Sequence, residues 1–168
     1  MAPVLAADIG GTNIRLAIYD DKYNVLYREN HETAAVADFH DMINDFLEHA
    51  KPDVKGKVVS GCFAVAGPVK VVAERNRVEM TNAHFIVDES LIERNTHLEN
   101  ARVLNDFTAI GYCVNVLKSK DYKLLRKGKK AAHEPKVVVG AGTGLGIAIL
   151  VPTNEHFEPI KSEGGHAD

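Results

Sequence analysis

The chain has 168 residues, of which 45% are hydrophobic and 26% are charged, and its formal net charge is −3 at pH 7. This composition is typical of a globular protein with a sizeable core. The slight negative charge offers no basic footprint for nucleic acid or for an anionic membrane surface, so neither is expected as a partner. Small-molecule chemistry is favoured instead.

The cysteines and the N-terminus bear on the compartment of the protein. Cys62 and Cys113 lie far apart, without the paired spacing of a disulfide framework or a zinc site, and we expect two buried thiols. The chain enters an apolar strand directly after Met1-Ala-Pro, without a basic segment followed by a long apolar run. No later stretch reaches about 18 uninterrupted apolar residues. These features predict a cytoplasmic protein.

The first part of the chain predicts strands interrupted once by a helix. Short apolar runs predict three strands, over residues 4–7, 14–19 and 25–27. Apolar residues at helical spacing predict an amphipathic helix over 36–50, which ends at Lys51-Pro52. A buried strand is expected over 58–66, and Gly67-Pro68 forces a turn after it.

The second part continues the alternation of helices and strands. A short helix capped by Asp88 is expected to end near Thr96. A second helix is expected from Asp106 to about Leu117. The lysine-rich stretch 118–136 is typical of a solvated connection. Short apolar runs predict three further strands, over residues 101–104, 137–139 and 147–151.

The mixture of strands and crossover helices predicts an α/β fold. An apolar strand, a glycine-rich turn and a second apolar strand occur in this order at the start of the chain and again after residue 140. This repetition suggests two related halves.

The first turn, Asp8-Ile-Gly-Gly-Thr-Asn13, combines residue types that suit a phosphate. Gly10 and Gly11 tolerate positive φ and let backbone N–H groups approach a phosphate without a Cβ in the way. Thr12 and Asn13 add a hydroxyl and an amide just beyond them. Asp8, at the end of the strand, can hold a hydrated magnesium ion beside the phosphates. An ordinary Gly-Gly hairpin has the same pattern, so both interpretations stay open at this point.

The second glycine cluster, Gly140-Ala-Gly-Thr-Gly-Leu-Gly146, is not a dinucleotide fingerprint. Counted from either of its first two glycines, the sixth position is not glycine, and a strand follows where that motif needs a helix. The pattern of glycine, four residues and Gly-Lys-Ser/Thr is also absent from the sequence. A second phosphate-binding hairpin fits better, in which Gly142, Thr143 and Gly144 contact the phosphates and Thr143 adds a hydroxyl.

Two further clusters offer carboxylates to a polyhydroxylated ligand. Asn105 and Asp106 stand side by side where a strand is expected to meet a helix, and Asp106 can accept a hydroxyl proton as a general base. A simple helix cap is the alternative for Asp106. Glu163 and His166 flank a pair of glycines and can hydrogen-bond sugar hydroxyls, although the same residues suit an exposed polar turn.

Six motifs, taken together and in this order, resemble those of the bacterial-type glucokinases, a family of ATP-dependent hexokinases. They are Asp8-Ile-Gly-Gly-Thr-Asn13, Phe63-Ala-Val-Ala-Gly-Pro68, Met80-Thr-Asn82, Leu104-Asn-Asp-Phe107, Gly142-Thr-Gly-Leu-Gly146 and Ser162-Glu-Gly-Gly-His-Ala-Asp168. The resemblance implies an α/β actin-like ATPase (ribonuclease H-like) sugar kinase fold. Residues 1–117 would form the N-terminal domain, and residues 118–168 the linker and the start of the C-terminal domain.

The resemblance also implies the substrates and the role of each residue. ATP, with Mg²⁺ as cofactor, would phosphorylate the 6-hydroxyl of glucose, and Asp106 matches the general base of the family. The residues that match its sugar-contacting positions are Asn82, Asn105, Asp106, Glu163 and His166. The residues that match its phosphate-binding positions, with Asp8 also holding Mg²⁺ through water, are Asp8, Gly10, Gly11, Thr12, Asn13, Gly142, Thr143 and Gly144.

Members of that family are substantially longer than this chain. The resemblance therefore implies that the adenosine surface and a further sugar-contacting glutamate belong to a C-terminal part outside this sequence. The partners that it implies are a complementary C-terminal chain or, for a full-length form, a second copy in a homodimer. Two alternatives remain open, namely a non-catalytic sugar-binding or regulatory protein of the same family and another actin-like phosphotransferase, acting on polyphosphate or an acyl phosphate. The intact Asp106 favours catalysis over the first alternative, and the sugar-contacting residues Asn105, Asp106, Glu163 and His166 argue against the second.

Overall fold

The computed structural model describes residues 2–80, 83–129, 133–141 and 145–160. Contacts within the chain group into two compact units, Met1–Asp106 and Phe107–Asp168. The boundary between the units falls inside the helix expected from Asp106, whereas the sequence suggests a domain division after residue 117. That division stays a prediction. Within the described residues, no helix has the length and apolar character needed to cross a membrane.

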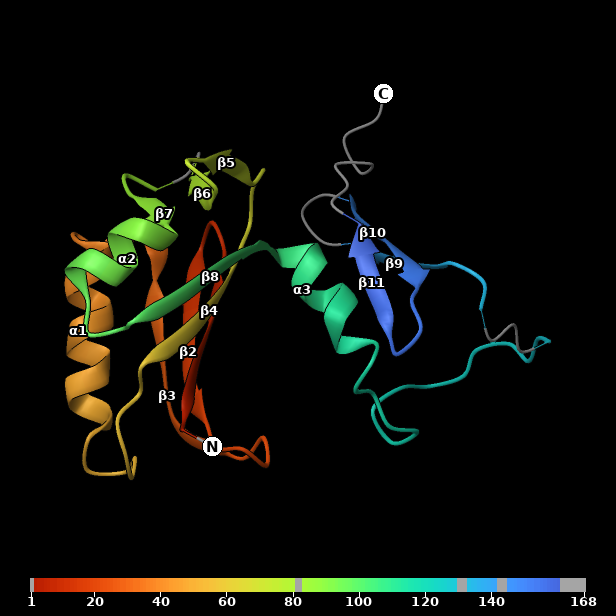
Figure 1. Ribbon diagram of the computed structural model, residues 1–168, viewed down its shortest axis with the longest axis horizontal. Helices are drawn as coiled ribbons and strands as arrows, with labels where there is room; N and C mark the ends of the chain where they lie inside the picture. The colour runs from red at the N-terminus through yellow and green to blue at the C-terminus, as the bar shows by residue number, and fades with distance from the viewer. Residues whose placement is uncertain (1, 81–82, 130–132, 142–144, 161–168) are drawn as a thin grey trace. The chain divides into compact units, whose positions relative to one another are not determined.

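A five-stranded sheet forms the centre of the first unit (Figure 1). Its order is β3-β2-β1-β4-β8, with β1 at Val4–Ile9, β2 at Asn13–Tyr19, β3 at Val25–Glu32, β4 at Ser60–Val65 and β8 at Asn100–Asn105. The strands β1, β2 and β3 pair antiparallel, whereas β1, β4 and β8 run parallel. Each apolar run identified in this part of the sequence overlaps one of these strands, so the five predicted strands are confirmed.

The core lies on one side of this sheet, under α1 (Phe39–Ala50) and α2 (Glu89–Asn95) (Figure 1). Alternate strand residues point into it, so Leu5 and Ile9 are buried whereas Asp8 is exposed. Burying a side chain of leucine size contributes about 1.5–3 kcal/mol. The residues with which α1 completes the core recur at helical spacing and are Phe39, Met42, Ile43, Phe46, Leu47 and Ala50.

Carboxylate caps fix where both helices begin. Asp38 accepts hydrogen bonds from the backbone N–H groups of His40 and Asp41, at 2.7 and 3.0 Å. Because this cap satisfies the first turn, α1 begins later than the apolar periodicity suggests. The predicted cap of α2 is confirmed, since the carboxylate of Asp88 accepts from the N–H of Leu91 at 3.0 Å.

The sequence does not predict a small antiparallel sheet made of β5 (Lys70–Val72), β6 (Arg75–Glu79) and β7 (Ile86–Asp88). Its strands are short, and most of their side chains are polar or exposed. Asn76 ties the middle strand to the main sheet, because its side-chain amide donates to the carbonyl of Val103 at 2.9 Å. Contacts with distant segments therefore stabilise this sheet.

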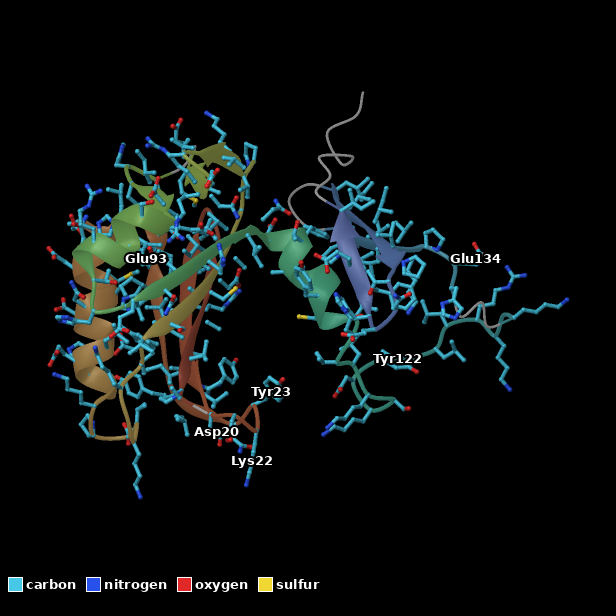
Figure 2. The ribbon with its side chains drawn as sticks, viewed as in Figure 1. Asp20, Lys22, Tyr23, Glu93, Tyr122 and Glu134 are labelled. Carbon is cyan, nitrogen blue, oxygen red and sulfur yellow. The ribbon has the colours of Figure 1, made fainter. Side chains whose placement is uncertain are left out.

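The carboxylate of Glu89 links three elements of the first unit. Its side chain is fully buried at the start of α2. It accepts from the backbone N–H groups of Asn76 in β6, at 3.1 Å, and Val103 in β8, at 2.9 Å. The Arg75 guanidinium lies 3.5 Å from it and also pairs with Glu93, which is labelled on α2 in Figure 2.

The second unit contains α3 from its second residue onward and a three-stranded antiparallel sheet in the order β11-β10-β9. The bounds are Asp106–Cys113 for α3, Lys136–Ala141 for β9, Leu145–Pro152 for β10 and Phe157–Ile160 for β11. The strands expected over 137–139 and 147–151 are confirmed. At Gly111 of α3, an added Cβ would lie 2.8 Å from Cβ of Pro159 and 2.9 Å from Cδ2 of Leu150. Glycine therefore permits the helix to approach the sheet closely.

The helix α3 ends at Cys113, short of the predicted end at Leu117. The backbone N–H groups of 114–116 bond to carbonyls three residues earlier, as in a tighter turn. The Asn115 amide group also pairs with the backbone of Phe157, donating to its carbonyl and accepting from its N–H, each at 2.8 Å. This pairing with β11 competes with a further helical turn.

The connection between α3 and β9 is exposed over residues 115–129 and 133–135, as its lysine content predicts. Figure 2 labels Tyr122 and Glu134 within it. The expectation of two buried thiols is wrong for Cys113, which is exposed at the end of α3. Cys62 is partly buried, and this burial, together with the charge of Glu89, raises the pKa of its thiol.

Replacing Glu89 tests whether its buried carboxylate organises the first unit. We expect Glu89→Ala to lower the free energy of unfolding by about 3 kcal/mol, because two backbone N–H groups lose their acceptor. Chemical denaturation followed by circular dichroism measures the change. The control is Glu99→Ala, which removes an exposed carboxylate 2.7 Å from Lys57 and should cost less than about 1 kcal/mol. Equal losses in the two variants would contradict this prediction.

Candidate functional site

Three parallel strands end at one edge of the five-stranded sheet. Ile9, Val65 and Asn105 are register partners at the carboxyl ends of β1, β4 and β8. The turn after β1 and the start of α3 after β8 therefore emerge from the same edge, about 10 Å apart across two strand spacings. Open α/β sheets bind ligands in the crevice outside the carboxyl ends of their strands. This edge is the candidate site.

A buried threonine holds the turn between β1 and β2. The N–H of Gly10 donates to the carbonyl of Asn13 at 2.9 Å. Thr33, only 1% exposed, donates from its hydroxyl to the carbonyl of Gly10 at 2.8 Å and from its N–H to the carbonyl of Thr12 at 2.9 Å. An added Cβ at Gly10 would crowd the carbonyl oxygen of Asn13 at 3.2 Å. The turn is thus tight and fixed, while Gly11 and Thr12 stay exposed to solvent.

Asp8 and Arg15 form an ion pair on the open side of the sheet. They are register partners, and Nη1 of Arg15 donates to Oδ2 of Asp8 at 2.8 Å. Their side chains are 53% and 64% exposed, so water and a ligand can reach them. A single carboxylate suits Mg²⁺ that keeps several waters and takes its other ligands from a substrate phosphate. Among the described residues, no cluster of three or more His, Cys, Asp or Glu side chains could hold a metal ion alone.

Asn105 ends β8 and Asp106 begins α3, at the strand-to-helix junction that the sequence predicts. The Nδ2 group of Asn105 donates to the carbonyl of Gly67 at 3.2 Å, which orients the amide. Gly67 has a φ of +147°, which side chains rarely adopt, so the turn after β4 requires glycine there. Asp106 lies at a helix N-terminus, where the helix dipole favours a negative charge.

Part of the predicted site lies within the described residues, and the fold brings that part together. Asp8, the turn 10–13, Asn105 and Asp106 all lie at the carboxyl edge of the parallel strands. The other predicted site residues lie outside the described residues and are Asn82, Gly142, Thr143, Gly144, Glu163 and His166. The individual roles of all these residues stay predictions.

Two residues that build this edge are missing from the sequence-based prediction. Arg15 has a detectable signal, because a hairpin that turns at Gly10-Gly11 pairs Asp8 with Arg15 across its strands. Thr33 has none, because it lies 23 residues from Gly10 and no local pattern marks it.

The comparison with family models decides the family. The model described as Glucokinase matches residues 5–168, which is nearly the whole chain. The chain belongs to the glucokinase family. The family resemblance inferred from the six motifs is therefore confirmed.

Curated relatives show how much of a glucokinase this family member spans. The chain is 37% identical to the glucokinase of Photorhabdus laumondii over 165 residues, which cover 98% of the chain and 49% of that relative. It is 31% identical to the glucokinase of Nostoc punctiforme over 172 residues, which cover 100% of the chain and 48% of that relative. The chain thus spans about half the length of the curated glucokinases it matches.

Solved structures establish the fold of this glucokinase-family chain. A glucokinase from an Antarctic psychrotroph matches 99% of the chain, and the match covers 52% of that structure, with a TM-score of 0.81 and 30% identity. A glucokinase from Streptomyces griseus, solved with glucose and AMPPNP, matches 94% of the chain and 46% of its own length, with a TM-score of 0.61 and 21% identity. The predicted actin-like ATPase sugar kinase fold is confirmed.

Two substitutions distinguish the exposed and buried parts of this edge. We expect Asp8→Asn to change the free energy of unfolding by less than about 1 kcal/mol, because its ion pair is solvated. We expect Thr33→Val, which keeps the side-chain shape, to cost about 1 kcal/mol or more through the lost hydrogen bond to Gly10. Thermal and chemical denaturation measure both. Destabilisation by Asp8→Asn that equals or exceeds that of Thr33→Val would mean that Asp8 is a structural residue.

Proposed function

We propose that this chain forms the sugar-binding and first phosphate-binding part of an enzyme that transfers a phosphoryl group from ATP to the 6-hydroxyl of glucose. The observation that carries the proposal is the placement of the turn 10–13 and of Asn105-Asp106 at one edge of the sheet. The family match and the glucose and AMPPNP bound to the Streptomyces griseus glucokinase support the choice of substrates.

Asp106 takes the proton of the sugar in this proposal. As the 6-hydroxyl oxygen attacks the γ-phosphorus in line, its O–H bond breaks and the proton passes to the Asp106 carboxylate, while the bond from phosphorus to the ADP oxygen breaks. The amide of Asn105, oriented by its hydrogen bond to Gly67, can hydrogen-bond a neighbouring sugar hydroxyl. Asn82, Glu163 and His166 complete the proposed sugar contacts.

The turn between β1 and β2 serves the phosphates in this proposal. Its fixed backbone and the exposed Gly11 and Thr12 leave N–H and hydroxyl groups accessible, and Gly142, Thr143 and Gly144 would act from the second hairpin. Asp8 would hold hydrated Mg²⁺ beside them. The metal, when bound, neutralises charge that develops on the transferring phosphoryl group. The separation of about 10 Å between this turn and Asp106 leaves room for a hexose and a terminal phosphate.

The remaining half of a glucokinase is the partner that we propose for this chain, from a longer form or a complementary chain. An apolar face of the β9–β11 sheet supports this view. Register pairs place its residues on one face, and each is at least 38% exposed; they are Val137, Val139, Leu145, Ile149 and Ile160. A homodimer and a cytoplasmic location stay predictions.

Asp106→Asn tests the proposed reaction. We expect kcat to fall by about 10²–10⁴-fold while glucose affinity is kept, because an amide can hydrogen-bond the sugar but cannot accept its proton. A coupled assay for glucose 6-phosphate with Mg-ATP measures kcat, and calorimetry measures glucose binding. Both are run on the chain alone and with the C-terminal half of the Photorhabdus laumondii relative added. The matched control is Asp45→Asn, on the exposed face of α1.

The outcomes separate the three functions under consideration. A near-normal kcat in Asp106→Asn would reject this residue as the base. Glucose binding without turnover, even with the C-terminal half present, would favour a non-catalytic sugar-binding protein. Phosphoryl transfer from polyphosphate or an acyl phosphate without glucose binding would favour another actin-like phosphotransferase.

A further inference from the structure

Phe107, the second residue of α3, lies against two glycines of the β9–β10 hairpin. Gly140 and Gly146 are register partners across that hairpin. An added Cβ at Gly146 would lie 1.8 Å from Cε2 of the Phe107 ring and 2.0 Å from its Cζ, and one at Gly140 would lie 2.5 Å from Cζ. Cβ atoms essentially never approach other atoms within 3.0 Å. The ring therefore fills space that any other residue at these two positions would need.

The two facing glycines form a seat for the ring, and Gly140 and Gly146 are called the glycine seat below. Glycine inside a strand lowers the stability of the fold by roughly 0.5–1 kcal/mol relative to alanine. Two facing glycines therefore weaken a hairpin unless another interaction compensates. Here the gain is close packing of an aromatic ring directly on the strand backbone. The glycine seat lies within the paired strands β9 and β10 and is separate in sequence from residues 142–144, for which phosphate binding stays a prediction.

The seated ring is the immediate neighbour of the proposed base. Asp106 is the last residue of the first compact unit, and Phe107 is the first residue of the second. Both belong to the first turn of α3, where the helical hydrogen-bond pattern limits their independent movement. Holding the ring of Phe107 therefore restrains the helical turn to which Asp106 belongs.

We propose that Phe107 is a positioning residue: its ring, held in the glycine seat, anchors the first turn of α3, which begins with Asp106. This inference rests on the proposed function, in which Asp106 takes the sugar proton. The ring then restrains the helical turn that carries the proton acceptor. A misplacement of about 1 Å in such an arrangement can lower turnover by about 10²-fold.

A double-mutant cycle in the kinase assay tests the coupling. Phe107→Ala removes the ring, and Gly146→Ala places a methyl group where the ring lies. We expect each variant to lower kcat by about 10²-fold with glucose affinity kept. The double variant should be no worse than Phe107→Ala, because both changes abolish the same contact. An unchanged kcat in Phe107→Ala, or losses that multiply in the double variant, would overturn the proposal.

Two controls make the same kinds of substitution elsewhere in the chain. Gly128→Ala adds a methyl group in the exposed connection, where no atom lies within 4 Å of the added Cβ. Phe157→Ala removes a ring of β11 that contacts Lys136, with Nζ 3.5 Å from the ring centre. Both should keep kcat. A loss of kcat in Phe157→Ala equal to that in Phe107→Ala would mean that the effect comes from weakening the second unit and would overturn the positioning role.

Hydrogen exchange provides a measurement that does not need turnover. In Phe107→Ala, Gly146→Ala and the double variant, we expect the amides of residues 110–113, which donate to the carbonyls of 106–109 in an α-helix, to exchange faster than in the unsubstituted chain. The increase should be the same in Phe107→Ala and in the double variant. Unchanged exchange would overturn the anchoring of Asp106. If the unsubstituted chain shows no kinase activity even with the C-terminal half added, the proposed function fails, while the exchange result still decides whether Phe107 anchors this turn.

Discussion

The parallel pairing of β1, β4 and β8 is the constraint on which the proposed chemistry depends. It aligns Ile9, Val65 and Asn105 across the sheet, so everything that follows these strands begins at one edge. An antiparallel arrangement would have sent the glycine turn and Asp106 to opposite ends. The apolar core lies on one face of the sheet. The residues at the carboxyl edge do not have to be apolar, so polar side chains can lie there.

Hydrogen bonds from buried polar side chains hold together segments that are far apart in the sequence. Thr33 fastens the turn between β1 and β2 from the end of β3, and Glu89 joins α2 to β6 and β8. Each satisfies two backbone groups, so the cost of burying it is offset by hydrogen bonds. These hydrogen bonds hold the turn and the strands in place from buried positions.

The sequence predicts the elements that depend on residues close together in the chain. The strands of the main sheet and the helix α1 follow from apolar periodicity, and the cap at Asp88 and the helix start at Asp106 follow from residue type at a junction. The small sheet of β5 to β7 and the early end of α3 depend on partners far along the chain, as in the pairing of Asn115 with Phe157, 42 residues away. Among the site residues, Asp8, Asn105 and Asp106 had motif signals, whereas Thr33 and the seating of Phe107 become visible only when distant strands are assembled.

The glycine seat also constrains how this sequence can change over evolutionary time. The ring of Phe107 and the missing side chains of Gly140 and Gly146 share one volume. Replacing the aromatic residue first leaves a void, and replacing either glycine first creates a clash. Each single substitution is therefore unfavourable without a change at the other positions. The three positions should therefore covary among relatives. Aligned sequences alone would then reveal the contact between them.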